Sequence, residues 1–268
     1  MPLELSLGQV FLSEFMGTAM LLLLGAGVCA ATSFNHSNAK GAGWLTINWG
    51  WGIAVFAGAL VAFKTGGHLN PAVTLGTVAS GADYYVGSEG AENAVPVTAA
   101  TTIIYIVAQF LGAFVGAALC WLAYKKQFDA DQPAGSKLGA FSTGPQIKAP
   151  VWNVVTEAIA TFVLVFVIFC VGRGTSEAAT GTPVSNLGWL GALGVAVLIV
   201  GIGASLGGPT GYAINPARDL GPRLWFAVMP SPNKGSANWG YAWVPVVGPI
   251  IGGVVAGLLV NFVPFFTV

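Results

Sequence analysis

The sequence has little charge and few cysteines. Of its 268 residues 7% are charged, against roughly 25% in an ordinary soluble domain. The formal net charge is zero, and no basic run suited to nucleic acid occurs. A chain with so little charge cannot cover a normal water-exposed surface. The three cysteines fall in apolar stretches and are expected to be buried small hydrophobes, so we expect no disulfide, metal site or cofactor.

Apolar residues make up 55% of the chain and form long runs. Each of six runs is long enough to cross a hydrocarbon core of roughly 30 Å as a helix. The 38 glycines and 15 prolines are compatible with helices in lipid. The first run lacks a basic leading segment and is expected to remain as an uncleaved helix. The class is a polytopic all-α membrane protein with spans at Phe11–Ala31, Trp44–Phe63, Thr101–Ala123, Val151–Val171, Leu187–Leu206 and Tyr241–Val263.

Two halves of the chain repeat the same order of features. Each half has a glutamate early in its first span, Glu14 or Glu157, and then a second span. A glycine-rich break and an Asn-Pro-Ala tripeptide follow, Asn70-Pro71-Ala72 or Asn215-Pro216-Ala217. Three spans per half is an odd number, so the halves must enter the membrane in opposite orientations, as an inverted repeat. We expect one channel domain, with a first repeat at 1–123, a water-exposed loop at 124–150 and a second repeat at 151–268.

The apolar segments after the tripeptides, 71–80 and 216–226, are too short to span a membrane. Asparagine caps free backbone amides and proline fits the first helical position, so each tripeptide predicts a helix start. We expect two re-entrant half-helices whose amino ends meet near the bilayer midplane, beside irregular backbone that lines a cavity. A capping asparagine uses its oxygen on the backbone. Both side-chain amide hydrogens of Asn70 and Asn215 should then face the lumen.

The glycine-rich breaks should supply acceptors to the same lumen. Inward-facing backbone carbonyls beside an apolar wall would match the hydroxyls and carbons of a polyol. His68 has two open interpretations, a structural residue hydrogen-bonded within the break or a lumen-lining side chain. The residues expected to contribute these carbonyl acceptors to the lumen wall are Gly66, Gly67, His68, Thr210, Gly211 and Ala213.

The paired Asn-Pro-Ala boxes, six spans and paired glutamates resemble the aquaporin superfamily along essentially the whole chain. GHLNPAVT and GYAINPARDLGP are most similar to its glycerol-facilitator branch, in which an aspartate directly follows the arginine of the second box, as Asp219 follows Arg218 here. The resemblance implies a passive channel for glycerol and other small uncharged solutes that excludes protons and ions. Water, urea, dihydroxyacetone and undissociated lactic acid are further candidate solutes.

The resemblance also implies roles for individual residues. Glu14 and Glu157 would brace the breaks by accepting backbone amides. Water-selective members usually carry histidine where this chain has Gly203, so the constriction should be wider here. It would be lined by Trp49, Gly203, Tyr212 and Arg218.

The expected partners are small neutral solutes, water and membrane lipid, with no nucleic acid. The resemblance implies a homotetramer in the plasma membrane with both termini cytoplasmic. A water-selective aquaporin is the alternative within channels, disfavoured by Gly203 and Asp219. An intramembrane enzyme built on Glu14, Glu157 and His68, or a structural membrane protein, is the alternative of another class. Neither explains two matched Asn-Pro-Ala boxes, so we expect no enzyme.

Overall fold

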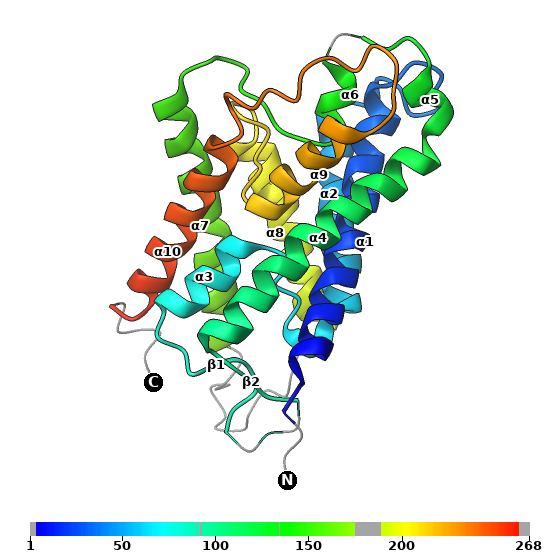
Figure 1. The fold of residues 1–268 in the computed structure, drawn as a ribbon. Helices are drawn as coiled ribbons and strands as arrows, with labels where there is room; N and C mark the ends of the chain where they lie inside the picture. The colour runs from blue at the N-terminus through cyan, green and yellow to red at the C-terminus, as the bar shows by residue number, and fades with distance from the viewer. Residues whose placement is uncertain (1–3, 90, 92, 134, 175–188, 263–268) are drawn as a thin grey trace.

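The computed structural model describes residues 4–89, 91, 93–133, 135–174 and 189–262. It is a bundle of long helices, with shorter helices between them and at one end (Figure 1). The predicted boundaries at Leu187 and Val263 lie outside the described residues. The long helices are α1 (Leu7–Ser33), α2 (Trp44–Val61), α4 (Ala99–Ala123), α7 (Pro150–Gly174), α8 (Trp189–Leu206) and α10 (Val244–Val260).

Within the described residues, five of these helices are long and apolar enough to cross a membrane: α1, α2, α4, α7 and α8. The sixth predicted span corresponds to α10, an apolar helix of 17 residues. At 1.5 Å per residue it covers about 26 Å. The helical membrane class predicted from composition is therefore confirmed.

Small residues bring the long helices into close contact in corresponding places of the two halves. A methyl group added at Gly112 of α4 would lie 2.3 Å from the carbonyl oxygen of Phe15 in α1. In the other half, one added at Gly252 of α10 would lie 2.1 Å from the carbonyl oxygen of Ala158 in α7. Both distances are far below van der Waals contact. Helix association in lipid relies on such close packing, because apolar burial alone supplies no driving force there.

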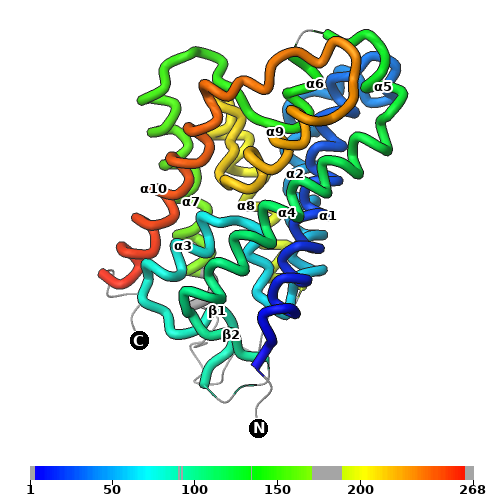
Figure 2. Tube along the Cα trace, in the orientation of Figure 1, coloured from blue at the N-terminus to red at the C-terminus, as the bar shows by residue number. Residues whose placement is uncertain are grey.

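The two predicted half-helices are α3 (Pro71–Ala79) and α9 (Pro216–Val228). Their ends differ by one and two residues from the prediction. Each packs against the opposite half of the chain, α3 on α10 and α9 on α4. Gly76 and Gly221 lie at these contacts, since a methyl group on either would lie within 3.1 Å of the partner helix backbone. The halves therefore interlock through their short helices (Figure 2).

The loop between the halves carries α5 (Lys125–Asp129) and α6 (Ser136–Gly139). The prediction that this loop lies in water is wrong for part of it. Phe128 and Phe141 are fully buried, stacked with their ring centroids 5.1 Å apart. Lys137 is 3% exposed and donates from Nζ to the carbonyl oxygen of Pro232 at 2.6 Å. Apolar burial holds the loop against the bundle, and the lysine amine finds a backbone partner there.

A short antiparallel ladder joins β1 (Tyr84–Val86) to β2 (Val95–Pro96), with Tyr84 opposite Pro96. It lies at the opposite end of the bundle from α5 and α6 (Figure 1). The 3₁₀ turn η1 (Phe63–Thr65) precedes the first break. Neither element was predicted, because both are only two or three residues long.

Candidate functional site

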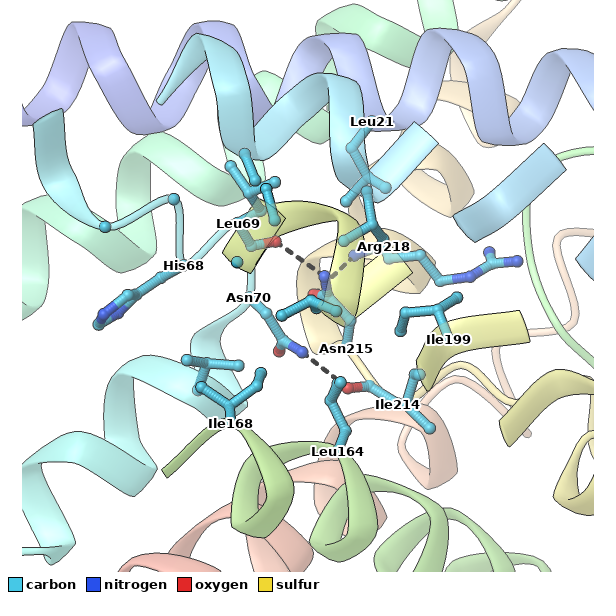
Figure 3. Close-up of a pocket in the computed structure, with 18 of the residues that line it drawn as sticks. Leu21, His68, Leu69, Asn70, Leu164, Ile168, Ile199, Ile214, Asn215 and Arg218 are labelled. Carbon is cyan, nitrogen blue, oxygen red and sulfur yellow. Dashed lines mark hydrogen bonds between the residues drawn. The ribbon is translucent and has the colours of Figure 1, made fainter. Parts of the chain in front are cut away.

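A cavity of about 750 Å³ lies between the two halves. Apolar side chains such as Leu21, Leu164 and Ile199 form much of its wall, and both breaks contribute polar groups (Figure 3). It therefore combines an apolar surface with a small set of fixed polar groups, as solute-binding cavities do. The predicted site residues that line it are Gly66, Gly67, His68, Asn70, Tyr212, Ala213, Asn215 and Arg218.

The asparagine of each break caps its own half-helix. Oδ1 of Asn70 accepts from the backbone N–H of Ala72 at 2.9 Å. Oδ1 of Asn215 accepts from those of Ala217 and Arg218 at 2.9 and 3.1 Å. Proline follows each asparagine at the first helical position, where no intrahelical donor is needed. The six tripeptide residues Asn70, Pro71, Ala72, Asn215, Pro216 and Ala217 are all buried.

Each asparagine also bonds across the centre to the other break. Nδ2 of Asn70 donates to the carbonyl oxygen of Ile214, and Nδ2 of Asn215 donates to that of Leu69, both at 2.8 Å (Figure 3). The prediction that both amide hydrogens face the lumen is wrong, because one of each pair is used in this exchange. The exchange ties the two half-helices together at their amino ends. One amide hydrogen on each asparagine remains for a solute.

The residues that receive these bonds have unusual backbone geometry. Leu69 and Ile214 have φ angles of 53° and 44°. This left-handed region is uncommon for residues other than glycine and is strained for a β-branched side chain such as isoleucine. The surroundings must hold such a conformation in place, and it tends to occur at functional sites.

A buried glutamate holds each break in that conformation. Glu14 accepts from the backbone N–H groups of His68 and Leu69 at 3.1 and 2.8 Å. Glu157 accepts from those of Ala213 and Ile214 at 3.0 and 2.8 Å. A threonine hydroxyl bonds each glutamate as well, Thr65 to Glu14 and Thr210 to Glu157. Both carboxyl groups are fully buried and surrounded by donors, so they face the protein backbone and not the cavity.

Thr210 and Gly211 are not among the residues that line the cavity. Thr210 is fully buried and points its hydroxyl at Glu157, 2.6 Å away. Gly211 has a φ of 85° and packs against Thr143. These two residues shape the second break from behind, which differs from the expected arrangement of lumen carbonyls.

His68 lines the cavity and is also bonded within the break. Its Nδ1 lies 3.1 Å from Oγ1 of Thr74. Its ring packs against those of Tyr85 and Tyr105, with centroids 5.3 and 4.9 Å away. The two interpretations left open by the sequence are therefore both compatible with its position.

Arg218 is fixed at one side of the cavity by two contacts. Its Cζ lies 3.8 Å from the centroid of the Trp51 ring, in a cation–π arrangement. Its Nη1 donates to the carbonyl oxygen of Phe141 in the inter-repeat loop at 3.0 Å. The buried section of that loop thus helps to orient the guanidinium.

The structure does not bring Trp49 to this site, contrary to prediction. Trp49 is 50% exposed and shares one outer face of α2 with Leu45 and Ile53, which are 61% and 46% exposed. Trp51 is 3% exposed and lines the cavity in its place. Two residues along a helix correspond to a rotation of about 200°, so only one of these tryptophans can face the cavity.

Gly203 lies beside the site, but the space next to it is filled. A methyl group added there would be 2.5 Å from the Asn48 amide and 2.7 Å from Cζ of Tyr212. The Gly203 carbonyl accepts from Nε1 of Trp44 at 2.9 Å. The expectation that this glycine widens the constriction needs correction, because its missing side chain makes room for Tyr212 and Asn48.

Asp219 forms a buried ion pair with Arg223. Its Oδ1 accepts from Nε and Nη2 of Arg223 at 2.9 and 2.7 Å, and both side chains are fully buried. Its Oδ2 accepts from the backbone N–H and hydroxyl of Thr143 at 2.7 and 2.8 Å. Arg223 also donates to the carbonyl oxygens of Thr143 and Ala237. The pair fixes the loop section that includes Phe141, and through it the partner of Arg218.

Sequence reasoning missed four residues of the site. Helical spacing was a usable signal for Trp44, Asn48 and Trp51, which recur at intervals of four and three along α2. Asn48 is also a polar residue in an apolar span, which is itself a functional indication. Nothing in the sequence indicated Phe141, since it contributes only a carbonyl group.

Comparisons with known proteins agree over nearly the full length. A model of the family described as major intrinsic protein matches residues 4–260. The chain is 45% identical over 247 residues to the glycerol uptake facilitator protein of Streptococcus pneumoniae strain R6, covering 92% of this chain and 95% of that protein. It is 43% identical over 264 residues to glycerol uptake facilitator protein 3 of Lactiplantibacillus plantarum, covering 98% of each.

A solved structure shows the same similarity in three dimensions. It is the X-ray structure of the aquaglyceroporin from Plasmodium falciparum, with a TM-score of 0.75 and 27% sequence identity. The similarity covers 97% of this chain and 99% of that one. The family-model match, at residues 4–260, includes both breaks and both half-helices.

Proposed function

Since this chain belongs to the major intrinsic protein family, we propose that it is a passive membrane channel for glycerol and other small uncharged solutes. The family is one of channels, so the chain is a transport protein and not an enzyme. The observation that carries the proposal is the pair of hydrogen bonds that Asn70 and Asn215 donate to the Ile214 and Leu69 carbonyls of the opposite breaks. They lie at the wall of a largely apolar cavity that Arg218 also lines.

The polar groups suit hydroxyl-bearing solutes. Each asparagine keeps one amide hydrogen for a solute oxygen, and Arg218 offers further donors. Gly66, Gly67, His68 and Ala213 lie at the same wall, where backbone carbonyls accept from solute hydroxyls. Leu21, Leu164 and similar side chains face the carbon skeleton. A polyol can then exchange its water for these groups one hydroxyl at a time.

The same groups exclude cations. The two half-helices direct their amino ends toward the central asparagines, and each end carries about half a positive charge. We place the narrow part of the pore at Arg218, which lines the cavity and adds a positive charge there. A hydronium or metal cation would have to lose its hydration shell next to these charges, which a neutral solute does not.

Glu14 and Glu157 act as structural braces in this proposal. They hold Leu69 and Ile214 in the strained geometry that directs one carbonyl of each break to the opposite asparagine. Asp219, with Arg223, braces the loop behind Arg218. The selectivity region then comprises Arg218, Tyr212, Gly203 and Trp51.

We further propose that the chain is a multi-pass protein of the plasma membrane with both termini in the cytoplasm. Residues 1–123 and 151–268 would be two repeats of one channel domain. The proposed assembly is a homotetramer with one pore in each subunit, in contact with lipid elsewhere. In support, α1 and α2 carry apolar side chains that are largely exposed in the single chain, including Leu12, Met16, Leu45 and Ile53.

Stopped-flow light scattering on proteoliposomes of the purified protein tests the proposal. Glycerol should enter far faster than in protein-free liposomes, which separates this function from that of a water-selective aquaporin. Arg218→Glu reverses the charge in the narrow part and should abolish the rapid uptake. Rapid water flow with glycerol uptake no faster than in protein-free liposomes would contradict the proposal.

A further inference from the structure

Asn48 is a fully buried polar side chain that the proposed function does not use. It lies in α2, one turn after Trp44 and one turn before Trp51. One end of its amide faces Nε1 of Trp44 and the backbone N–H of Ala204, both at 3.2 Å. Both of these groups can only donate hydrogen bonds. The amide oxygen must therefore point toward them.

The orientation of this amide determines what the other end offers. With the oxygen turned to Trp44 and Ala204, the amide nitrogen lies 2.8 Å from the hydroxyl oxygen of Tyr212 and donates to it. A hydroxyl group has one hydrogen and two lone pairs. Because the amide hydrogen occupies one lone pair, the Tyr212 hydrogen cannot point toward Asn48. Tyr212 lines the cavity, as Arg218 does, and its hydroxyl hydrogen is not taken up by Asn48.

Two nearby carbonyl groups each accept one hydrogen bond already. The Gly203 carbonyl accepts from Trp44, and the Phe141 carbonyl accepts from Arg218. Arg218 itself has five N–H donors and no acceptor. The side chains of Arg218 and Tyr212 therefore present donors to a solute beside them.

We propose that Asn48 is a positioning residue that makes the Tyr212 hydroxyl a hydrogen-bond donor to the solute. The narrow part then favours a solute that presents a carbonyl oxygen over the alcohol of the same size. This inference rests on the proposed channel function and specifies its preference among small neutral solutes. Dihydroxyacetone and glycerol form a suitable pair, because they differ only in having a central carbonyl or a central hydroxyl.

The test measures the ratio of dihydroxyacetone permeability to glycerol permeability in proteoliposomes. Tyr212→Phe removes the donor and keeps the ring. Asn48→Leu removes the group that orients the donor and keeps a similar volume. Each should lower the ratio by about 2- to 12-fold, which corresponds to one net hydrogen bond. The double variant should lower it no further than either single one, because both changes act on the same hydroxyl.

Asn48→Asp provides a second route if Asn48→Leu does not fold. A carboxylate oxygen would accept the Tyr212 hydrogen and withdraw it from the solute, so the ratio should again fall. Trp49→Phe, on the outer face of α2, is the control and should leave the ratio unchanged.

The ratio separates this role from a purely structural one, because a damaged pore would slow both solutes together. Unchanged ratios in Tyr212→Phe and in the Asn48 variants, with glycerol flux retained, would overturn the inference and leave the channel function standing. Wild-type glycerol flux equal to that of protein-free liposomes would instead contradict the channel function itself.

Discussion

Removing the charge of Asp219, which lies in a buried ion pair, should destabilise the protein far more than removing the charge of an aspartate in a partly exposed ion pair. Asp219 accepts four hydrogen bonds and is fully buried with Arg223. In Asp219→Asn, the new amide nitrogen must face either Arg223 or the backbone N–H of Thr143, and both are donors. One buried donor loses its partner, and the Arg223 charge is left uncompensated. Breaking a buried pair in this way costs about 3–5 kcal/mol.

The chain provides a matched control for this change. Lys125 and Asp129 form an ion pair with the same spacing of four residues, but their side chains are 39% and 34% exposed. Asp129→Asn should therefore cost about 0–1 kcal/mol. Unfolding by sodium dodecyl sulfate in mixed micelles, followed by tryptophan fluorescence, gives both free energies. Equal losses of unfolding free energy for Asp219→Asn and Asp129→Asn would show that burial does not make the Asp219–Arg223 pair essential.

Three further predictions follow from the geometry. Trp51→Leu removes the ring that packs against Arg218, so the larger polyol erythritol should enter at a rate closer to that of glycerol. Trp49→Leu, the control, should leave the ratio of the two uptake rates unchanged. Both ratios are measured by parallel uptake experiments. Gly257→Ala places a methyl group 2.1 Å from the Gly76 carbonyl oxygen. It should lower the free energy of unfolding in dodecyl sulfate by about 1–3 kcal/mol. Gly194→Ala, with no atom within 4 Å, should be neutral or stabilising by about 0.5–1 kcal/mol. Channel-dependent uptake of labelled lactate should fall about tenfold per pH unit above the acid's pKa of roughly 4, since stripping water from the anion is unfavourable. Uptake that stays constant from pH 4 to 7 would show that the anion permeates.

The membrane class and the half-helix starts could be predicted from the sequence because local chemistry determines them. A run of apolar residues predicts a span whatever surrounds it. An asparagine followed by proline predicts a helix start, and α3 and α9 begin at Pro71 and Pro216. These features depend on neighbouring residues only.

The parts that were wrong or missed depend on rotation about a helix or on contacts between distant segments. Trp49 and Trp51 are both tryptophans in one apolar span, and only the packing of α2 on its neighbours shows which one faces the cavity. The bond from Asn70 to the Ile214 carbonyl joins residues 144 positions apart. No sequence pattern within either half of the chain predicts a contact between residues so far apart.

The inter-repeat loop was misjudged for a related reason. Its lysines and aspartates indicated a water-exposed segment, and Lys125 and Asp129 do form a partly exposed pair. Phe128 and Phe141 nevertheless pack into the bundle. Burial of two aromatic rings stabilises the packing of the loop on the bundle, because the charged groups nearby can still reach water or a carbonyl group.

Whether the pore passes neutral solutes and rejects ions can be tested on one preparation. Proteoliposomes loaded with a pH-sensitive dye would be exposed first to a glycerol gradient and then to a pH gradient. Glycerol uptake should be well above that of protein-free liposomes, and the pH gradient should dissipate no faster than in those liposomes. Rapid collapse of the pH gradient, or glycerol uptake no faster than the lipid background, would show that the pore does not select neutral solutes.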